Sequence, residues 1–167
     1  MPSTSRHPAE LDRSLGPCFG VWHARLRVQT EQPFQLVDIT ASIASFVASV
    51  GLDDGVVHVH TRHTTTGILV NEHEPLLFED LQRMFDRLTP ASEYYAHDDL
   101  TRRTVNLMPG ERHNGHAHCR AALLRASESV AVEDGTLALG RWQRVFLVEC
   151  DGAQPRHIAL TLIGRRR

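Results

Sequence analysis

Residues 56–72, with the sequence VVHVHTRHTTTGILVNE, constrain the fold of this chain more than any other segment. Two valines alternate with His58 and His60, and a period of two is typical of a β-strand. If the strand continues, His63 lies on the face of the valines, opposite the other two histidines. The segment therefore predicts a strand that carries imidazoles on both faces.

Polar side chains stand at both ends of the next predicted strand. Thr64 and Thr65 follow His63, and residues 68–70 are apolar before the chain continues with Asn71 and Glu72. Polar groups at the ends of buried strands are better placed to hold a ligand than to fill a core. The alternative is an ordinary strand–turn–strand unit with solvated side chains.

Composition limits the class of protein. A chain of 167 residues with 41% hydrophobic and 23% charged residues predicts one globular domain. We expect a flexible arm over residues 1–18 and a single domain over 19–167. A net charge of −2 argues against a nucleic-acid partner. No apolar run is long enough to cross a membrane, and three scattered cysteines are typical of a cytoplasmic protein.

Periodicity predicts the remaining elements. Alternation over residues 22–28 and a turn near Pro33 predict a hairpin with the strand that follows. Apolar stripes at helical spacing predict helices over 40–50 and after Pro75. A long loop over 91–113 leads to a short helix, and strands dominate the last third. The sum is about seven or eight strands and three helices, an α+β fold.

Three histidines that are far apart in the sequence could form a metal site. His63 follows a strand, His97 lies in the long loop, and His118 begins a helix. Three neutral imidazoles plus water are a familiar zinc arrangement. Separate, hydrogen-bonded histidines are the alternative, and the spacing does not decide between the two.

Several charged and amide side chains interrupt apolar strands. A carboxylate there, as at Glu72 and Glu149, must be paired or hydrogen-bonded, so each is a salt-bridge partner or a site residue. Arg156 is the cation for an anionic substrate or for Glu149. Gln143 could bind a substrate or satisfy a core backbone group. No phosphate-binding loop, dinucleotide fingerprint, GxSxG or HExxH motif is present.

Taken together, these motifs resemble the YjbQ-like family. HTTTGILVNE, Tyr95-Ala96-His97, Ala117-His118 and LALGRWQRVFLVECDG occur in that family's order, over nearly the whole domain. The resemblance implies an α+β, β-sandwich fold of mostly antiparallel strands that assembles as a homotrimer. It also implies a site near a subunit boundary, with a divalent metal, zinc or magnesium, at the histidines.

The resemblance implies ten site residues. The expected catalytic groups are Glu72, Glu149, His63 and His118, the expected metal ligands are His63, His97 and His118, and the expected substrate-binding residues are Thr64, Thr65, Asn71, Gln143 and Arg156. The chain departs from the usual family pattern at Thr66-Gly67, His73 and Arg141. These departures leave the identity of the substrate open.

The activity that the resemblance implies is that of a secondary thiamine-phosphate synthase. Such an enzyme joins a pyrimidine-methyl diphosphate to a thiazole phosphate and releases pyrophosphate, which requires cations for the leaving group. A metal-dependent hydrolase with a carboxylate general base is one alternative. A non-enzymatic trimer that binds a small anionic metabolite is the other.

Overall fold

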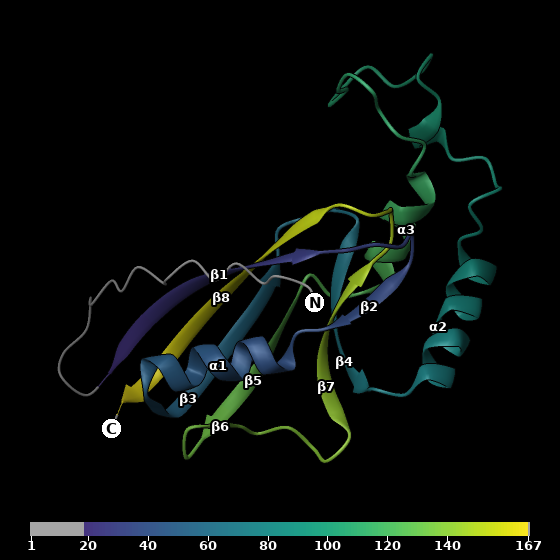
Figure 1. The fold of residues 1–167 in the computed structure, drawn as a ribbon. Helices are drawn as coiled ribbons and strands as arrows, with labels where there is room; N and C mark the ends of the chain where they lie inside the picture. Colours follow the sequence, from purple (N-terminus) through teal and green to yellow (C-terminus); the bar gives the residue numbers. More distant parts are fainter. Residues whose placement is uncertain (1–18, 167) are drawn as a thin grey trace.

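Two antiparallel sheets form the fold in the computed structural model, which describes residues 19–166 (Figure 1). The larger sheet has the strand order β1-β8-β3-β5-β6 and the smaller sheet the order β2-β7-β4. The described chain therefore confirms the expected α+β class with mostly antiparallel strands. The strands are β1 (Gly20–Gln29), β2 (Gln35–Asp38), β3 (Leu52–Thr61), β4 (Thr66–Glu72), β5 (Ser127–Glu133), β6 (Thr136–Leu137), β7 (Gln143–Glu149) and β8 (Pro155–Arg166).

The helices lie on different sides of the small sheet. Helix α1 (Thr40–Val50) packs its apolar stripe into the core and ends at Gly51, whose φ of +69° favours glycine. Helix α2 (Pro75–Leu88) begins at a proline, as expected, and the Glu74 carboxylate caps its first N–H groups. Helix α3 (Gly115–Leu123) follows the long loop, in which η1 (Ala96–Asp98) is one 3-10 turn.

Strand β7 separates two hydrophobic cores. Val145 and Leu147 pack with α1 and the larger sheet, whereas Val148 and Cys150 pack with residues of α2 and α3. Every residue from Val145 to Cys150 is buried, so the strand has no solvated face beyond Arg144. A strand that is covered on both faces has a nearly continuous apolar sequence. This burial also holds the end of β7 rigidly in the site described below.

The predicted hairpin between the first two strands is wrong. Strand β1 pairs along its whole length with β8, from Gly20 opposite Gly164 to Gln29 opposite Pro155. Strand β2 instead pairs with β7 in the other sheet. The chain does turn near Pro33, but there it passes from the larger sheet to the smaller one. The ten residue pairs between β1 and β8 stabilise this arrangement more than one local turn stabilises a hairpin.

Two arginines near the C-terminus are part of the larger sheet. Arg165 and Arg166 belong to β8, and the guanidinium of Arg166 lies 5.9 Å from the Trp22 ring centroid. Both residues are exposed, so these arginines extend the last strand without entering the core. The predicted N-terminal arm lies outside the described residues. No helix among residues 19–166 is long and apolar enough to span a membrane.

Candidate functional site

The turn between β3 and β4 carries the first group of expected site residues. Strand β3 ends at Thr61, whose hydroxyl lies 2.5 Å from that of Thr66 across the turn. Both hydroxyls are buried, so this hydrogen bond closes the turn from the inside. Thr64 is left exposed at the tip, whereas Thr65 is buried.

A buried ion pair lies behind this turn. The Arg156 guanidinium donates to both carboxylate oxygens of Glu149, at 2.6 and 2.5 Å, and to the Thr65 hydroxyl at 3.1 Å. Glu149 is fully buried, and Arg156 is 3% exposed. Of the two roles considered for Arg156, pairing with Glu149 is the one that the geometry favours, because both carboxylate-facing donors are used.

Glu149 also organises the backbone that follows it. Its Oε1 atom accepts hydrogen bonds from the N–H groups of Cys150 and Asp151, at 3.1 and 3.0 Å, and the Thr30 hydroxyl donates to Oε2 at 2.9 Å. Burial raises the pKa of this carboxyl, but the hydrogen bonds and the charge of Arg156 outweigh burial and hold the pKa below its usual range. A carboxylate so stabilised is an anchor and a poor general base.

His63 faces the start of β8. Its Nε2 atom accepts a hydrogen bond from the backbone N–H of His157 at 2.8 Å, and the two rings stack with centroids 6.0 Å apart. Burial, with the charges of Arg156 and His157, lowers the pKa of His63. The ring is therefore neutral near pH 7, with its proton on Nδ1.

The other two expected metal ligands meet each other. The ring centroids of His97 and His118 are 4.5 Å apart, and the Nε2 atom of His97 is buried without a hydrogen-bond partner. Burial and the neighbouring His97 lower the pKa of His118. Asp98 aligns η1 with α3, because its carboxylate accepts hydrogen bonds from the backbone N–H groups of Asn114 and Gly115 at the start of α3.

Residues 19–166 of one chain do not bring His63 together with the His97–His118 pair as a group of three metal ligands. Within residues 19–166, no group of three or more His, Cys, Asp or Glu side chains is arranged to hold a metal ion. His63 is held instead by the β8 backbone, while His97 and His118 lie on η1 and α3. The two paired imidazoles suit two positions of a zinc site, and a complete site would need ligands from elsewhere.

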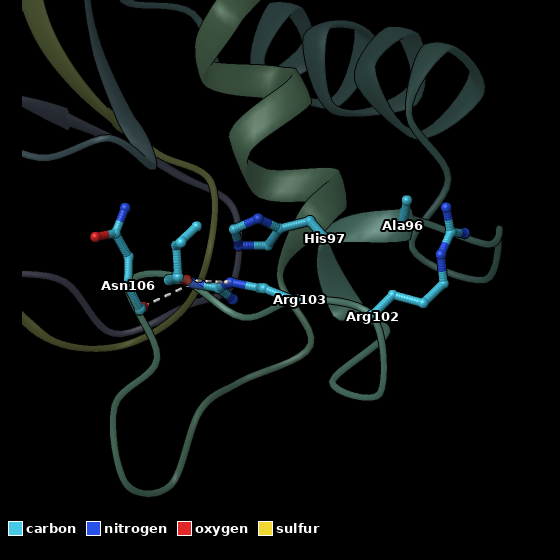
Figure 2. Close-up of a pocket in the computed structure, with 6 residues that line it drawn as sticks. Ala96, His97, Arg102, Arg103 and Asn106 are labelled. Atoms are coloured by element: carbon cyan, nitrogen blue, oxygen red, sulfur yellow. Dashed lines mark hydrogen bonds between the residues drawn. The ribbon is translucent and has the colours of Figure 1, made fainter.

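A hollow of about 510 Å³ lies over η1 (Figure 2). His97 and Arg103 extend toward the same side, whereas Arg102 turns away. Arg103 is fixed by Glu111 at 2.8 Å and by the carbonyl of Asn106 at 2.9 Å, so the long loop is ordered around it. The hollow is lined by Ala96, His97, Arg102, Arg103, Val105 and Asn106, with no carboxylate among them.

The remaining expected residues lie at the other end of the small sheet. Strands β4 and β7 are antiparallel, with Glu72 opposite Gln143 at one end and Thr66 opposite Glu149 at the other. At about 3.3 Å per residue, the two ends are roughly 20 Å apart. Asn71, Glu72 and Gln143 line a separate hollow of about 360 Å³. The expected residues on and beside these strands therefore form two groups at opposite ends of the small sheet, and the His97–His118 pair is a further set on η1 and α3.

Sequence reasoning missed two residues of the first group. Thr30 is fully buried, and its hydroxyl donates a hydrogen bond to Glu149, which is 119 residues later in the sequence. Such a contact depends on the fold topology, so no local sequence pattern indicates it. His157 fixes the tautomer of His63 through its backbone N–H, which any residue other than proline could supply. Its imidazole beside Arg156 was the only sequence signal available.

The comparisons place this architecture among known proteins. The family model described as "UPF0047 protein YjbQ-like" matches residues 24–165. The chain belongs to the YjbQ-like UPF0047 family. A UPF0047 protein of Archaeoglobus fulgidus is 38% identical over 133 residues, which cover 80% of this chain and 94% of that protein. YugU of Bacillus subtilis is 32% identical, with 83% and 97% of the two chains covered.

Solved structures show the same fold in this family. A YbjQ-like protein of unknown function from Sulfolobus solfataricus P2 has a TM-score of 0.78 and 33% identity, covering 87% of this chain and 99% of that one. A hypothetical protein from Aeropyrum pernix K1 has a TM-score of 0.75 and 32% identity, covering 85% and 98%. The YjbQ-like resemblance inferred from the motifs is confirmed.

Proposed function

We propose that this YjbQ-like protein is a small-molecule transferase that binds a phosphorylated metabolite in the hollow over η1. The observation that carries this proposal is the buried Nε2 atom of His97, which has no hydrogen-bond partner among residues 19–166. The side chains of His97 and Arg103 both line the hollow. A buried polar atom without a hydrogen bond costs about 1–3 kcal/mol, so a ligand oxygen there would be stabilised. The lining contributes two arginines and no carboxylate, and with Glu111 paired to Arg103 one positive charge is left in excess, which favours an anion.

The reaction type follows from the family resemblance. The C–O bond between a pyrimidine-methyl group and its diphosphate breaks, the thiazole ring nitrogen forms the new C–N bond, and pyrophosphate leaves. Arg103 would offset part of the charge that develops on the diphosphate, and His97 would form a hydrogen bond to it; both contributions are strong where water is excluded. If His97 and His118 instead held a divalent metal, it would take the place of the His97 hydrogen bond and supply Lewis-acid stabilisation, and imidazole ligands favour zinc over magnesium.

Assembly as a homotrimer is part of the proposal. The two groups of expected residues lie at opposite ends of β4 and β7 in one chain, so a site that used both would have to combine two subunits. Edge strands such as β1 and β6 also leave backbone groups that a neighbour could pair or cover. We place the protein in the cytoplasm, which agrees with free thiols at Cys119 and Cys150.

Pyrophosphate release tests the proposal. The protein is supplied with the pyrimidine-methyl diphosphate, the thiazole phosphate, or both, and release is expected only with both. His97→Ala should lower the rate at least about tenfold, as expected when a transition-state hydrogen bond is lost. The matched control His113→Ala changes an exposed histidine of the same loop and should leave the rate unchanged.

Two other outcomes would each overturn the transferase assignment. Release with the diphosphate alone would indicate a hydrolase. Saturable binding of both compounds without any product would indicate a binding protein.

A further inference from the structure

The outward face of the larger sheet carries two imidazoles that the proposed transferase site does not use. Strand β3 buries Val57 and Val59, both 0% exposed, in the core, so His58 and His60 project from the opposite face. Helix α1 packs on the valine side, and within residues 19–166 both histidines stay partly exposed. The alternation of the strand therefore places two neighbouring imidazoles on an open surface.

The two rings are arranged in a way that suits a shared ligand. Their centroids are 6.3 Å apart, and their planes differ by 14°. A tetrahedral metal ion with both nitrogen atoms at about 2.0–2.1 Å holds the two ring centroids roughly 5 Å apart, so side-chain rotations that close the gap by roughly 1 Å are sufficient. Imidazoles two residues apart on one strand can thus bind the same ion.

Ser129 on β5 determines which nitrogen of His58 is available. The Nδ1 atom of His58 lies 3.0 Å from the Ser129 hydroxyl, and the two residues are paired in the sheet. Neither Nε2 of His58 nor the ring of His60 makes a hydrogen bond to another residue in the range 19–166. A metal-binding histidine commonly uses its second ring nitrogen in such a hydrogen bond, which fixes the tautomer and orients the ring.

The side chains beside the pair are small and uncharged. The four cross-strand neighbours are Thr161, Ser129, Ala159 and Ser127. Two arginines lie further away: Arg25 is on β1, two strands from His60, and Arg62 is exposed just beyond the end of β3. Solvent and salt screen the charges of exposed guanidinium groups, so their repulsion of a cation at the pair is weak.

His23 shows why the pair differs from a single histidine. It lies on the same face, on β1, and its Nδ1 atom is likewise 3.2 Å from a hydroxyl, that of Thr161. The residue two positions later is Arg25, so His23 offers one nitrogen only. When one imidazole has bound an ion, a second one on the same strand binds it intramolecularly, which raises the affinity by about 10²–10⁴-fold.

We propose that His58 and His60 form a bidentate site for a late first-row divalent metal ion, with Ser129 orienting His58. Imidazole nitrogen favours such ions over magnesium and calcium, and copper(II) binds most tightly in this series. Within residues 19–166 no third His, Cys, Asp or Glu side chain joins the pair, so water fills the remaining coordination positions. The site shares no residue with the proposed transferase site and does not depend on that proposal.

Titration with copper(II), followed by electron paramagnetic resonance, tests the site. The full chain carrying His118→Ala is the background, because this change removes the imidazole pair on η1 and α3. We expect one tightly bound copper ion whose spectrum shows two imidazole nitrogens. Adding His58→Ala or His60→Ala should weaken binding at least about 100-fold. Ser129→Ala should weaken it about tenfold, and the matched control His23→Ala should leave it unchanged.

A double variant separates a chelate from two independent ligands. His58→Ala combined with His60→Ala should bind copper hardly more weakly than either single variant, because the first substitution already removes the chelate. Copper affinity that is unchanged in either single variant would overturn the site. An equal loss in His23→Ala would also overturn it, as would magnesium competing with copper as well as nickel does.

Discussion

The backbone N–H of His157 donates a hydrogen bond to Nε2 of His63 at 2.8 Å, so one strand end fixes the tautomer of an imidazole on a turn 94 residues earlier. The same contact places the ring beside the charge of Arg156, which with burial lowers the pKa of His63. His63 is thus a neutral N–H donor through Nδ1 near pH 7, whatever reaction the site performs.

This contact predicts the pH dependence of stability. The pKa of His63 is lower in the folded than in the unfolded chain, so its contribution to folding is present above the ordinary value of 6.5 and is lost as the pH falls through the folded pKa. Urea unfolding between pH 5 and 8 should therefore show the stability gap between the unmodified protein and His63→Gln narrowing as the pH falls. His23→Gln, at an exposed position on β1, is the control. A gap that widens on acidification would contradict the assignment.

The Glu149–Arg156 pair predicts a large effect on stability. Both side chains are almost fully buried, so Arg156→Ala would leave an uncompensated carboxylate, at a cost of about 3–5 kcal/mol in the free energy of unfolding. Arg125→Ala removes a partner of Glu128 from a side chain that is 77% exposed and should cost about 1 kcal/mol or less. Chemical denaturation measures both. Equal small losses would mean that the pair does not anchor the turn.

Sequence periodicity predicted the elements better than their partners. The alternation in residues 56–61 and the apolar stripe of α1 are local, because a strand or helix must bury one face. The false hairpin between β1 and β2 shows the limit, since no local signal tells which of two sheets a strand joins.

The candidate site shows the same limit. The sequence identified Glu149 and Arg156 and offered their pairing as one alternative, because a buried carboxylate needs a cation. It could not separate His63 from the His97–His118 pair, nor place Glu72 at the far end of β4 from Thr66. The distances between these residues depend on strand pairing, which the sequence does not show. For this reason the residues expected in one site lie in separate groups.

Oligomerisation supplies a third prediction. The long loop exposes four apolar side chains, Leu100, Val105, Leu107 and Met108, around the ordered Arg103. Native mass spectrometry should give three times the chain mass of 18.7 kDa. Leu107→Asp with Met108→Asp should shift the protein toward monomer, since a desolvated carboxylate is costly at an interface. Leu76→Asp, on an exposed apolar residue of α2, is the control. A monomeric unmodified protein would refute the trimer.

Metal binding should depend on a phosphate ligand. The chain offers two neighbouring imidazoles, at His97 and His118, and within residues 19–166 no third protein ligand joins them. Two imidazoles alone leave most of the coordination shell to water, so zinc should be lost on dialysis unless diphosphate oxygens complete the site. Elemental analysis after dialysis measures zinc with and without pyrophosphate.

The variants decide which histidines hold the ion. Free pyrophosphate removes loosely bound zinc, so zinc retained in its presence requires a ternary complex. Zinc retention should be lost in His118→Ala and in His97→Ala. It should be unchanged in His63→Ala, because the Nε2 atom of His63 already accepts a hydrogen bond from the β8 backbone. Stoichiometric zinc without pyrophosphate that disappears in His63→Ala would instead mean that all three histidines meet, an arrangement not present within residues 19–166 of one chain.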